Sequence, residues 1–220
     1  MNFSHAALLV IDLQMVSWPN EYYGVPNMPQ IVKNVQPVLT GCRNMGIPVI
    51  YTRQYHSKSG IDTSRGEPRL PEGYPYMEGS AGLEIVSAIK PAEKDIVINK
   101  HRWSAFFNTE TEIILRRLGI EHLIMCGVTT DCCVMLTAYD AFYRDYLITI
   151  IEDCCGATEH ALHQASIINM ANWIYQSKII KASELVKALE DKPYSVWEWQ
   201  SPGAFTYTPD TMTQVFSKLK

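Results

Sequence analysis

The stretch HLIMCGVTTDCCVMLTAYDAFYRD, residues 122–145, decides the fold of this chain. An apolar, β-branched run stops at Gly127, small and polar residues turn the chain, and a helical pattern begins with two cysteines in its first turn. A strand that leads through a short turn into a helix is the repeating unit of a parallel α/β sheet. The turn also puts a thiol at a helix N-terminus, where the helix dipole favours the thiolate and free N–H groups can bind an oxyanion. The stretch therefore predicts an α/β fold and covalent chemistry.

The rest of the chain repeats this alternation of apolar runs and helical patterns. Residues 6–12 are almost all apolar, as expected for a strand that is buried on both faces. The further strands are expected at 47–52, 95–99, 123–126, 147–151 and 178–180, and the helices at 30–44, 83–89, 109–118, 132–144, 160–174 and 183–189. This pattern predicts three layers, with a parallel sheet between two layers of helices.

Length and composition indicate one folded domain. A chain of 220 residues can form one sizeable α/β domain, and 47% hydrophobic with 19% charged residues is typical of a globular protein. We expect the catalytic domain at 1–190, where the helical patterns end. Residues 191–220 form an aromatic extension that should pack on the domain or on a neighbouring subunit; its aromatic residues are Tyr194, Trp197, Trp199, Phe205, Tyr207 and Phe216.

Charge and cysteine usage exclude several classes of protein. A net charge of −4 gives no basic surface for nucleic acid or for an anionic membrane. The N-terminal apolar run is too short to span a membrane or to act as a signal peptide. The six cysteines include two adjacent pairs, a spacing unlike the disulfide framework of a secreted protein. We therefore expect a cytoplasmic protein with neither nucleic acid nor membrane as partner.

Three reactive side chains follow predicted strands. Asp12 ends the first strand, Lys100 follows the third, and Cys133 lies just beyond the fourth. Each also has an ordinary structural explanation by itself: Asp12 as a turn residue, Lys100 as a solvated charge, and Cys133 as a small buried side chain. Because ligands bind at the carboxyl ends of parallel strands, the three together favour a site with a carboxylate base, a cation and a thiol nucleophile.

Three segments resemble the isochorismatase-like cysteine hydrolases: VIDLQ (10–14), KHRWSAF (100–106) and GVTTDCCVMLTAYDAFYRDY (127–146). This superfamily includes nicotinamidases, N-carbamoylsarcosine amidohydrolases, biuret and ureidoacrylate hydrolases, and isochorismatases. The resemblance covers about residues 6–185. It implies a Rossmann-like, six-stranded parallel sheet of order 3-2-1-4-5-6 with helices on both faces.

The resemblance also assigns roles to single residues. It implies a catalytic triad of Asp12, Lys100 and Cys133, because the family pattern G-V-x-T-[DN]-x-C-V selects Cys133 rather than Cys132. In the family the peptide bond after the residue matching Val128 is usually cis. The N–H groups of Thr129 and Cys133 then form the oxyanion hole. The implied reaction is hydrolysis of a non-peptide C–N bond in a small carboxamide or ureido compound, through a thioester.

The region after the second strand departs from the metal-dependent members of the family. Nicotinamidases carry a metal-binding Asp and two His there, whereas this chain reads YTRQYHSKSGID without the D-x-H pattern. One histidine, His56, is too few ligands for a metal. We therefore expect an enzyme that needs no metal and no other cofactor.

The predicted substrate contacts and the assembly rest on position and composition. Gln54 matches a pocket position in parts of the family, and its amide can bond both a carbonyl and an N–H group. Trp18, Tyr22 and Trp103 are expected to line the pocket. The aromatic segments 54–80 and 191–220 are expected to be covered in a homodimer or homotetramer.

Three other functions are compatible with parts of the pattern. An isochorismatase-type vinyl-ether hydrolase needs no nucleophilic cysteine, so Cys133 speaks against it. A catalytically silent binding protein of the same fold would not need Asp12, Lys100 and Cys133 together. A thiol redox protein would normally use C-x-x-C, and this chain has only adjacent pairs.

Overall fold

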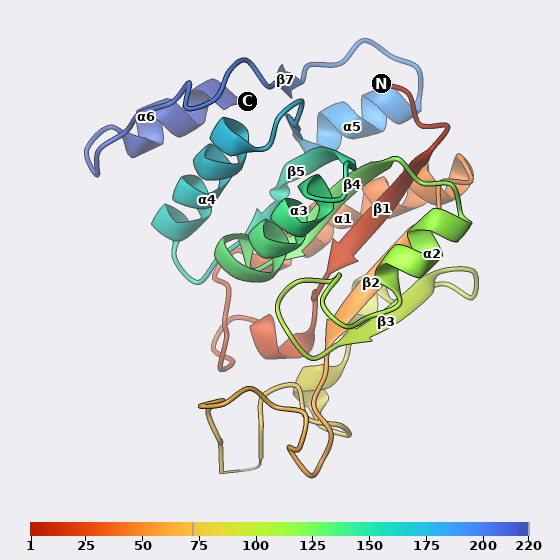
Figure 1. The fold of residues 1–220 in the computed structure, drawn as a ribbon, viewed down its shortest axis with the longest axis vertical. Helices are drawn as coiled ribbons and strands as arrows, with labels where there is room; N and C mark the ends of the chain where they lie inside the picture. The colour runs from red at the N-terminus through yellow and green to blue at the C-terminus, as the bar shows by residue number, and fades with distance from the viewer. Residues whose placement is uncertain (72, 220) are drawn as a thin grey trace.

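Strands form where the chain is apolar on both faces, because helices cover the sheet from both sides. The computed structural model describes residues 1–71 and 73–219, and Figure 1 shows the three layers. The strands are β1 (Ala6–Ile11), β2 (Val49–Gln54), β3 (Ile96–Lys100), β4 (His122–Val128), β5 (Leu147–Gly156), β6 (Lys178–Ile180) and β7 (Trp197–Glu198).

The sheet has the strand order β3-β2-β1-β4-β5-β6-β7. Strands β1 to β6 are parallel, which confirms the predicted order. The seventh strand was not predicted, because a two-residue strand leaves no periodic pattern in the sequence. It comes from the C-terminal extension and runs antiparallel to β6, with Trp197 opposite Ile179.

Helices cover both faces of this sheet. In Figure 1, α2, α3 and α4 lie in front of the sheet and α1 lies behind it, while α5 packs against α1. Helix α1 continues through Pro37. The bounds are α1 (Met28–Asn44), α2 (Thr111–Arg117), α3 (Met135–Phe142), α4 (His160–Trp173), α5 (Ala182–Leu189) and α6 (Met212–Phe216).

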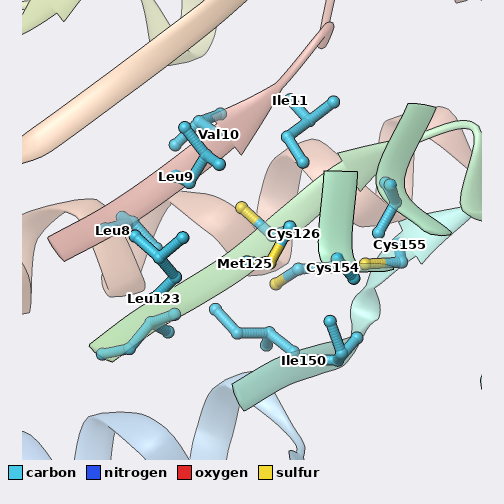
Figure 2. Packing of buried hydrophobic residues seen from close by; sticks show 14 of the residues in the cluster. Leu8, Leu9, Val10, Ile11, Leu123, Met125, Cys126, Ile150, Cys154 and Cys155 are labelled. Carbon is cyan, nitrogen blue, oxygen red and sulfur yellow. The ribbon is translucent and has the colours of Figure 1, made fainter. Parts of the chain in front are cut away.

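The core lies around the central strands. All six residues of β1 and all seven of β4 are buried. Figure 2 shows side chains of β1, β4 and β5 packed together, among them Leu9, Cys126 and Ile150. Burial of one such aliphatic side chain contributes about 1.5–3 kcal/mol, so these strands form a rigid base for the residues at their ends.

Strand β5 is longer than predicted. The sequence suggested an end at residue 151, because Glu152 and Asp153 resemble turn residues, but the strand runs to Gly156. The Asp153 carboxylate accepts the Ala182 N–H at 2.7 Å, which explains how an acidic residue stays within a strand. The adjacent cysteines 154 and 155 are consequently buried strand residues.

The predicted helix at 83–89 consists instead of two 3-10 turns, Ala81–Leu83 and Ser87–Ile89. Among the residues that the structure describes, no helix is both long and apolar enough to cross a membrane.

The C-terminal extension packs on its own chain. Helix α6 lies against α4, and the rings of Phe216 and His163 meet edge to face with centroids 5.5 Å apart. The Asn172 side chain donates to the Phe205 carbonyl and accepts the Phe205 N–H, both at 2.9 Å. The sequence left two places for these aromatic side chains, the chain's own domain or a neighbouring subunit. The contacts place them on the chain's own domain.

The long segment 55–80 lies below the carboxyl ends of β1 and β2 in Figure 1, and its described residues, 55–71 and 73–80, form no regular helix or strand. It is held by isolated β-bridges such as the one between His56 and Met77. The segment therefore covers the edge of the sheet at which the reactive residues were predicted.

Candidate active site

Asp12 follows β1 in a fixed conformation. Its φ of 50° lies in the left-handed region, which Asp tolerates better than most residues. Its N–H donates to the Thr52 carbonyl at 3.2 Å, and its Oδ1 accepts the Thr52 hydroxyl at 2.7 Å. Backbone and side chain are thus both tied to the end of the neighbouring strand, which directs the carboxylate along the carboxyl edge of the sheet.

Lys100 is the last residue of β3 and is completely buried. Its Nζ lies 2.6 Å from Asp12 Oδ2 and donates to Gln54 Oε1 at 2.9 Å and to the Arg102 carbonyl at 3.1 Å. A buried ammonium persists only when it is paired and hydrogen-bonded in this way. Burial alone would lower the pKa of Lys100, but the charge of Asp12 and the hydrogen bonds to Asp12 and Cys133 raise it above its usual value. The site therefore holds a permanent cation.

Cys133 completes the group from a third element. It lies in a π-helical turn, Thr130–Val134, between β4 and α3, and its Sγ is 3.4 Å from Lys100 Nζ. The structure thus brings together the three side chains that the sequence placed at strand ends. Lys100 is in the centre, with the Asp12 carboxylate and the Cys133 sulfur as its two partners.

Gly127 permits this approach of β4 to β1. Its φ is +131°, and a Cβ atom at this position would lie 2.0 Å from the Ile11 carbonyl oxygen. Any other residue would push the ends of the two strands apart. The glycine therefore determines that the Cys133 turn lies beside Asp12.

The protonation state of Cys133 differs from the expectation for a helix N-terminus. Contact with the Cys132 thiol and burial raise the pKa of Cys133 well above its usual value, although Lys100 acts in the opposite direction. Cys133 is buried within the turn, and the cost of burying a thiolate opposes the favourable interaction with the helix dipole. Cys133 is thus a neutral thiol at neutral pH, and its attack on a substrate requires a base.

The peptide bond between Val128 and Thr129 is cis, as the family resemblance implied. The Thr129 carbonyl accepts the N–H groups of Cys132 and Val134, both at 3.1 Å. These two bonds join the end of β4 to the first turn of the following helix. They position the segment that was predicted to contain the oxyanion hole, the N–H groups of Thr129 and Cys133.

A buried residue that sequence reasoning did not select positions Gln54. The Gln14 amide accepts the Gln54 N–H at 2.9 Å and donates to the Gln54 carbonyl at 3.0 Å and to the Leu83 carbonyl at 2.8 Å. This leaves the Gln54 side chain free to bond Lys100 and to face the cavity. The sequence feature that could have identified Gln14 is that it is a polar residue just after a buried strand.

A cavity of about 280 Å³ opens at this edge of the sheet. Its volume suits a small molecule rather than a peptide or a polymer. The residues that line it are Tyr23, Gln54, Glu67, Tyr76, Trp103, Thr129, Asp131, Cys132, Cys133 and Thr158.

The predicted pocket residues divide into two groups. Gln54 lines the cavity, and so does Trp103, which is 59% exposed at its mouth. Trp18 and Tyr22 lie outside it: Trp18 packs against the core, and the half-exposed Tyr22 lines a neighbouring hollow. The adjacent Tyr23 lines the cavity in place of Tyr22, and the two rings lie edge to face.

Tyr76 is a further cavity residue that the sequence did not indicate. It lies in the irregular segment with a φ of 60°, and its ring stacks on that of Tyr23 with centroids 5.6 Å apart. Burial raises the pKa of Tyr76 well above its usual value, and the nearby Cys133 and Asp12 raise it further. Tyr76 thus places an uncharged phenol beside the reactive group.

The structure also gives His56 partners that the sequence did not reveal. His56, Asp62 and His101 offer ligand atoms that all lie within 4.8 Å of one another. Two of these residues are already bonded within the protein. The Asp62 carboxylate accepts the N–H and the hydroxyl of Ser57, and His101 Nδ1 lies 3.0 Å from the Tyr55 carbonyl. Two of the three donors are therefore engaged within the protein, which argues against a ready metal centre, whereas both ring nitrogens of the buried His56 have no hydrogen-bond partner among the described residues.

We accordingly expect chelators to leave turnover unchanged. Incubation with EDTA or 1,10-phenanthroline followed by desalting should alter kcat by less than about twofold, because the triad needs no Lewis acid. Metal analysis of the same samples provides the control. Stoichiometric zinc, iron or manganese that is lost together with activity would contradict this expectation and assign the cluster of His56, Asp62 and His101 to a metal.

Comparison with known proteins identifies the family of this chain. The isochorismatase domain family matches residues 6–180. The chain is 30% identical over 194 residues to the ureidoacrylate amidohydrolase RutB of Acinetobacter baylyi, covering 74% of this chain and 76% of that protein.

Two solved structures are similar over most of their length. An isochorismatase family protein from Desulfovibrio vulgaris has a TM-score of 0.77 and 28% identity, covering 84% of this chain and 98% of the other. N-carbamoylsarcosine amidase from Thermoplasma acidophilum has a TM-score of 0.68 and 27% identity, covering 81% and 97%. The chain therefore belongs to the isochorismatase family and is a hydrolase of that family.

Proposed function

We propose that this protein is an amidohydrolase that cleaves a non-peptide C–N bond in a small carboxamide or ureido compound through a thioester on Cys133. The observation that carries the proposal is the position of Lys100 Nζ, 2.6 Å from Asp12 Oδ2 and 3.4 Å from Cys133 Sγ. The cation thus contacts both the carboxylate and the nucleophile beside a small cavity. The similarity to an amidohydrolase and to an amidase supports the choice of bond.

The first half of the reaction forms the thioester. Cys133 Sγ attacks the carbonyl carbon while its proton passes to the Asp12 carboxylate, because the resting thiol is neutral. Lys100 stabilises the negative charge that moves between these two groups. The N–H groups of Thr129 and Cys133 stabilise the oxyanion of the tetrahedral intermediate. Asp12 then donates the proton to the leaving nitrogen, and ammonia or an amine departs.

The second half releases the acid. The Asp12 carboxylate removes a proton from water, which attacks the thioester carbon, and the proton returns to the departing Cys133 sulfur. Each step uses Asp12 alternately as base and acid. A vinyl-ether hydrolase needs a proton donor but no nucleophile, so the thiol in contact with Lys100 favours amide hydrolysis.

An ammonia-release screen tests this function directly. The panel contains simple carboxamides, biuret, carbamoyl amino acids and ureido acids, and acid-quenched samples are digested and analysed by mass spectrometry. We expect release of ammonia from at least one compound and an acyl adduct on the peptide that contains Cys133. Absence of release from every class, or an adduct on another residue, would contradict the proposal.

We also propose a homodimer or homotetramer. Large apolar side chains are exposed around a hollow next to the active site, and they include Trp103, Phe107, Leu136 and Tyr143. Monomers seldom leave such side chains in contact with water as one patch. Light scattering at micromolar concentration should give at least twice the monomer mass of 25.0 kDa, and a Leu136→Glu variant should shift it towards the monomer. A monomer in the unmodified protein would contradict this assembly.

The proposed surroundings are the cytoplasm, with a small molecule as the partner and neither nucleic acid nor membrane. Each of the six cysteines is unpaired, which agrees with a reducing compartment.

A further inference from the structure

The charged side chains that line the cavity are negative. Among the described residues that line it are two carboxylates, Glu67 and Asp131, but neither lysine nor arginine. Lys100 lies behind the nucleophile and is engaged by Asp12 and Gln54. From the part of the wall that the structure describes, a substrate therefore meets a cation at its reacting end and carboxylates elsewhere.

Glu67 lies at the cavity with its carboxylate partly exposed. Its side chain is 16% exposed, and its Oε1 lies 3.7 Å from His56 Nε2. Burial lowers the pKa of His56, although Glu67 and Asp62 act to raise it, so His56 is neutral at neutral pH and does not cancel the carboxylate. The Arg102 guanidinium donates instead to the backbone carbonyls of Asp62 and His101.

Asp131 has a simpler explanation. It lies in the first turn of the helical segment after β4, where a negative charge interacts favourably with the helix dipole. Glu67 lies in an irregular loop and has no such role. Glu67 is therefore the carboxylate that the helix dipole does not account for, and Asp131 Oδ1, which is buried without a hydrogen-bond partner, adds a second negative group to the same cavity.

Aromatic rings complete the surface next to Glu67. Tyr23 and Tyr76 are stacked with an interplanar angle of 17°. Tyr23 and Glu67 line the same cavity. Burial, together with the charge of Glu67, raises the pKa of Tyr23 to about 12. The faces of neutral aromatic rings attract cations, and a carboxylate beside them strengthens this preference.

We propose that the substrate carries a positive charge at the end remote from the carbonyl group, and that Glu67 with the rings of Tyr23 and Tyr76 binds this charge. The proposal rests on the amide hydrolysis proposed above and names its substrate class: cationic carboxamides or ureas, such as those with an ammonium or guanidinium group. Ureidoacrylate, after which one relative is named, has a carboxylate. In this cavity that group would face Glu67 and Asp131, so this chain should select a different substrate.

Three ureas that differ only in their terminal charge test the preference. They are (4-aminobutyl)urea, pentylurea and 5-ureidopentanoate, and a carboxamide series with the same end groups accompanies them. We expect kcat/KM to be at least about tenfold higher for the cation than for the uncharged compound, and lowest for the anion. Calorimetry with the Cys133→Ala variant should give the same order for binding, independently of turnover.

Two variants assign the preference to one residue. Glu67→Gln should lower the cation-to-neutral ratio of kcat/KM about tenfold through KM, and Glu67→Lys should favour the anion. The matched control is Glu78→Gln, which removes an exposed carboxylate from the same segment and should leave the ratio unchanged.

The possible failures can be distinguished. If the protein cleaves uncharged or anionic amides but neither turnover nor calorimetry favours the cation, the charge preference is wrong and the amidohydrolase function stands. The preference for Glu67 is also wrong if Glu67→Gln and Glu78→Gln give the same ratio. If no amide or urea of any charge is cleaved, the proposed function itself fails, and with it the assignment of a substrate class.

Discussion

Replacement of Cys133 by alanine should lower kcat by at least about 10⁴-fold, because the variant lacks the atom that forms the thioester. The fold should remain, since the exchange removes one sulfur atom at the edge of a small cavity and leaves the Lys100–Asp12 ion pair in place. The measurement is ammonia release on the best compound of the screen, together with circular dichroism and thermal unfolding of both proteins.

The neighbouring thiol provides the control for this experiment. Cys132 also lines the cavity, but no contact with Lys100 links it to the triad as the 3.4 Å contact links Cys133. Cys132→Ala should therefore lose less than about tenfold in kcat. Equal losses in the two variants would mean that the wrong sulfur, or the wrong mechanism, has been assigned.

Replacement of Lys100 by methionine should abolish turnover and lower the free energy of unfolding by about 3–5 kcal/mol. Methionine fills a similar volume but leaves the buried Asp12 carboxylate without its cation, and loss of one partner from a buried pair is strongly destabilising. Urea unfolding monitored by circular dichroism measures the stability, and ammonia release measures the activity.

A second exchange separates the two effects. Asparagine tolerates the left-handed backbone of Asp12, so the double variant Asp12→Asn, Lys100→Met should recover part of the stability and none of the activity. The pKa of Lys100 is raised in the folded state, so its contribution is fully present below the unfolded pKa of about 10.4 and is lost as pH rises through the folded pKa. The difference in free energy of unfolding between the unmodified protein and Lys100→Met should thus stay constant from neutral to mildly alkaline pH. A gap that widens as pH rises would contradict this ion pair.

The order of the sheet could be predicted because its strands are apolar on both faces, but their ends could not. The sequence suggested ends at residues 52 and 99, whereas β2 extends to Gln54 and β3 to Lys100. The three additional residues, Arg53, Gln54 and Lys100, are polar, so they resemble the start of a loop. Gln54 and Lys100 lie opposite each other in the sheet, and the Lys100 side chain bonds the Gln54 side chain. Because the functional residues are polar, the hydrophobic pattern ends before the strands do.

The triad could be predicted for a different reason from the rest of the cavity. Asp12, Lys100 and Cys133 follow strands, and parallel strands bring their carboxyl ends to one edge. Glu67 and Tyr76 belong to a segment with no helix or strand period, so no pattern relates their positions to Cys133. Their contacts depend on local turns, such as the left-handed backbone of Tyr76, which the amino-acid type does not announce.

The Gln14 amide has a consequence for how such a protein can diversify. It bonds the backbone of Gln54, where the irregular segment begins, and of Leu83, where the chain returns to the sheet. One side chain thereby holds the two ends of this long loop together, and its hydrogen bonds offset part of the conformational entropy that is lost when the loop closes. Insertions and exchanges between these two anchors can reshape the substrate end of the cavity without moving the strand ends. Substrate choice can thus evolve separately from the chemistry.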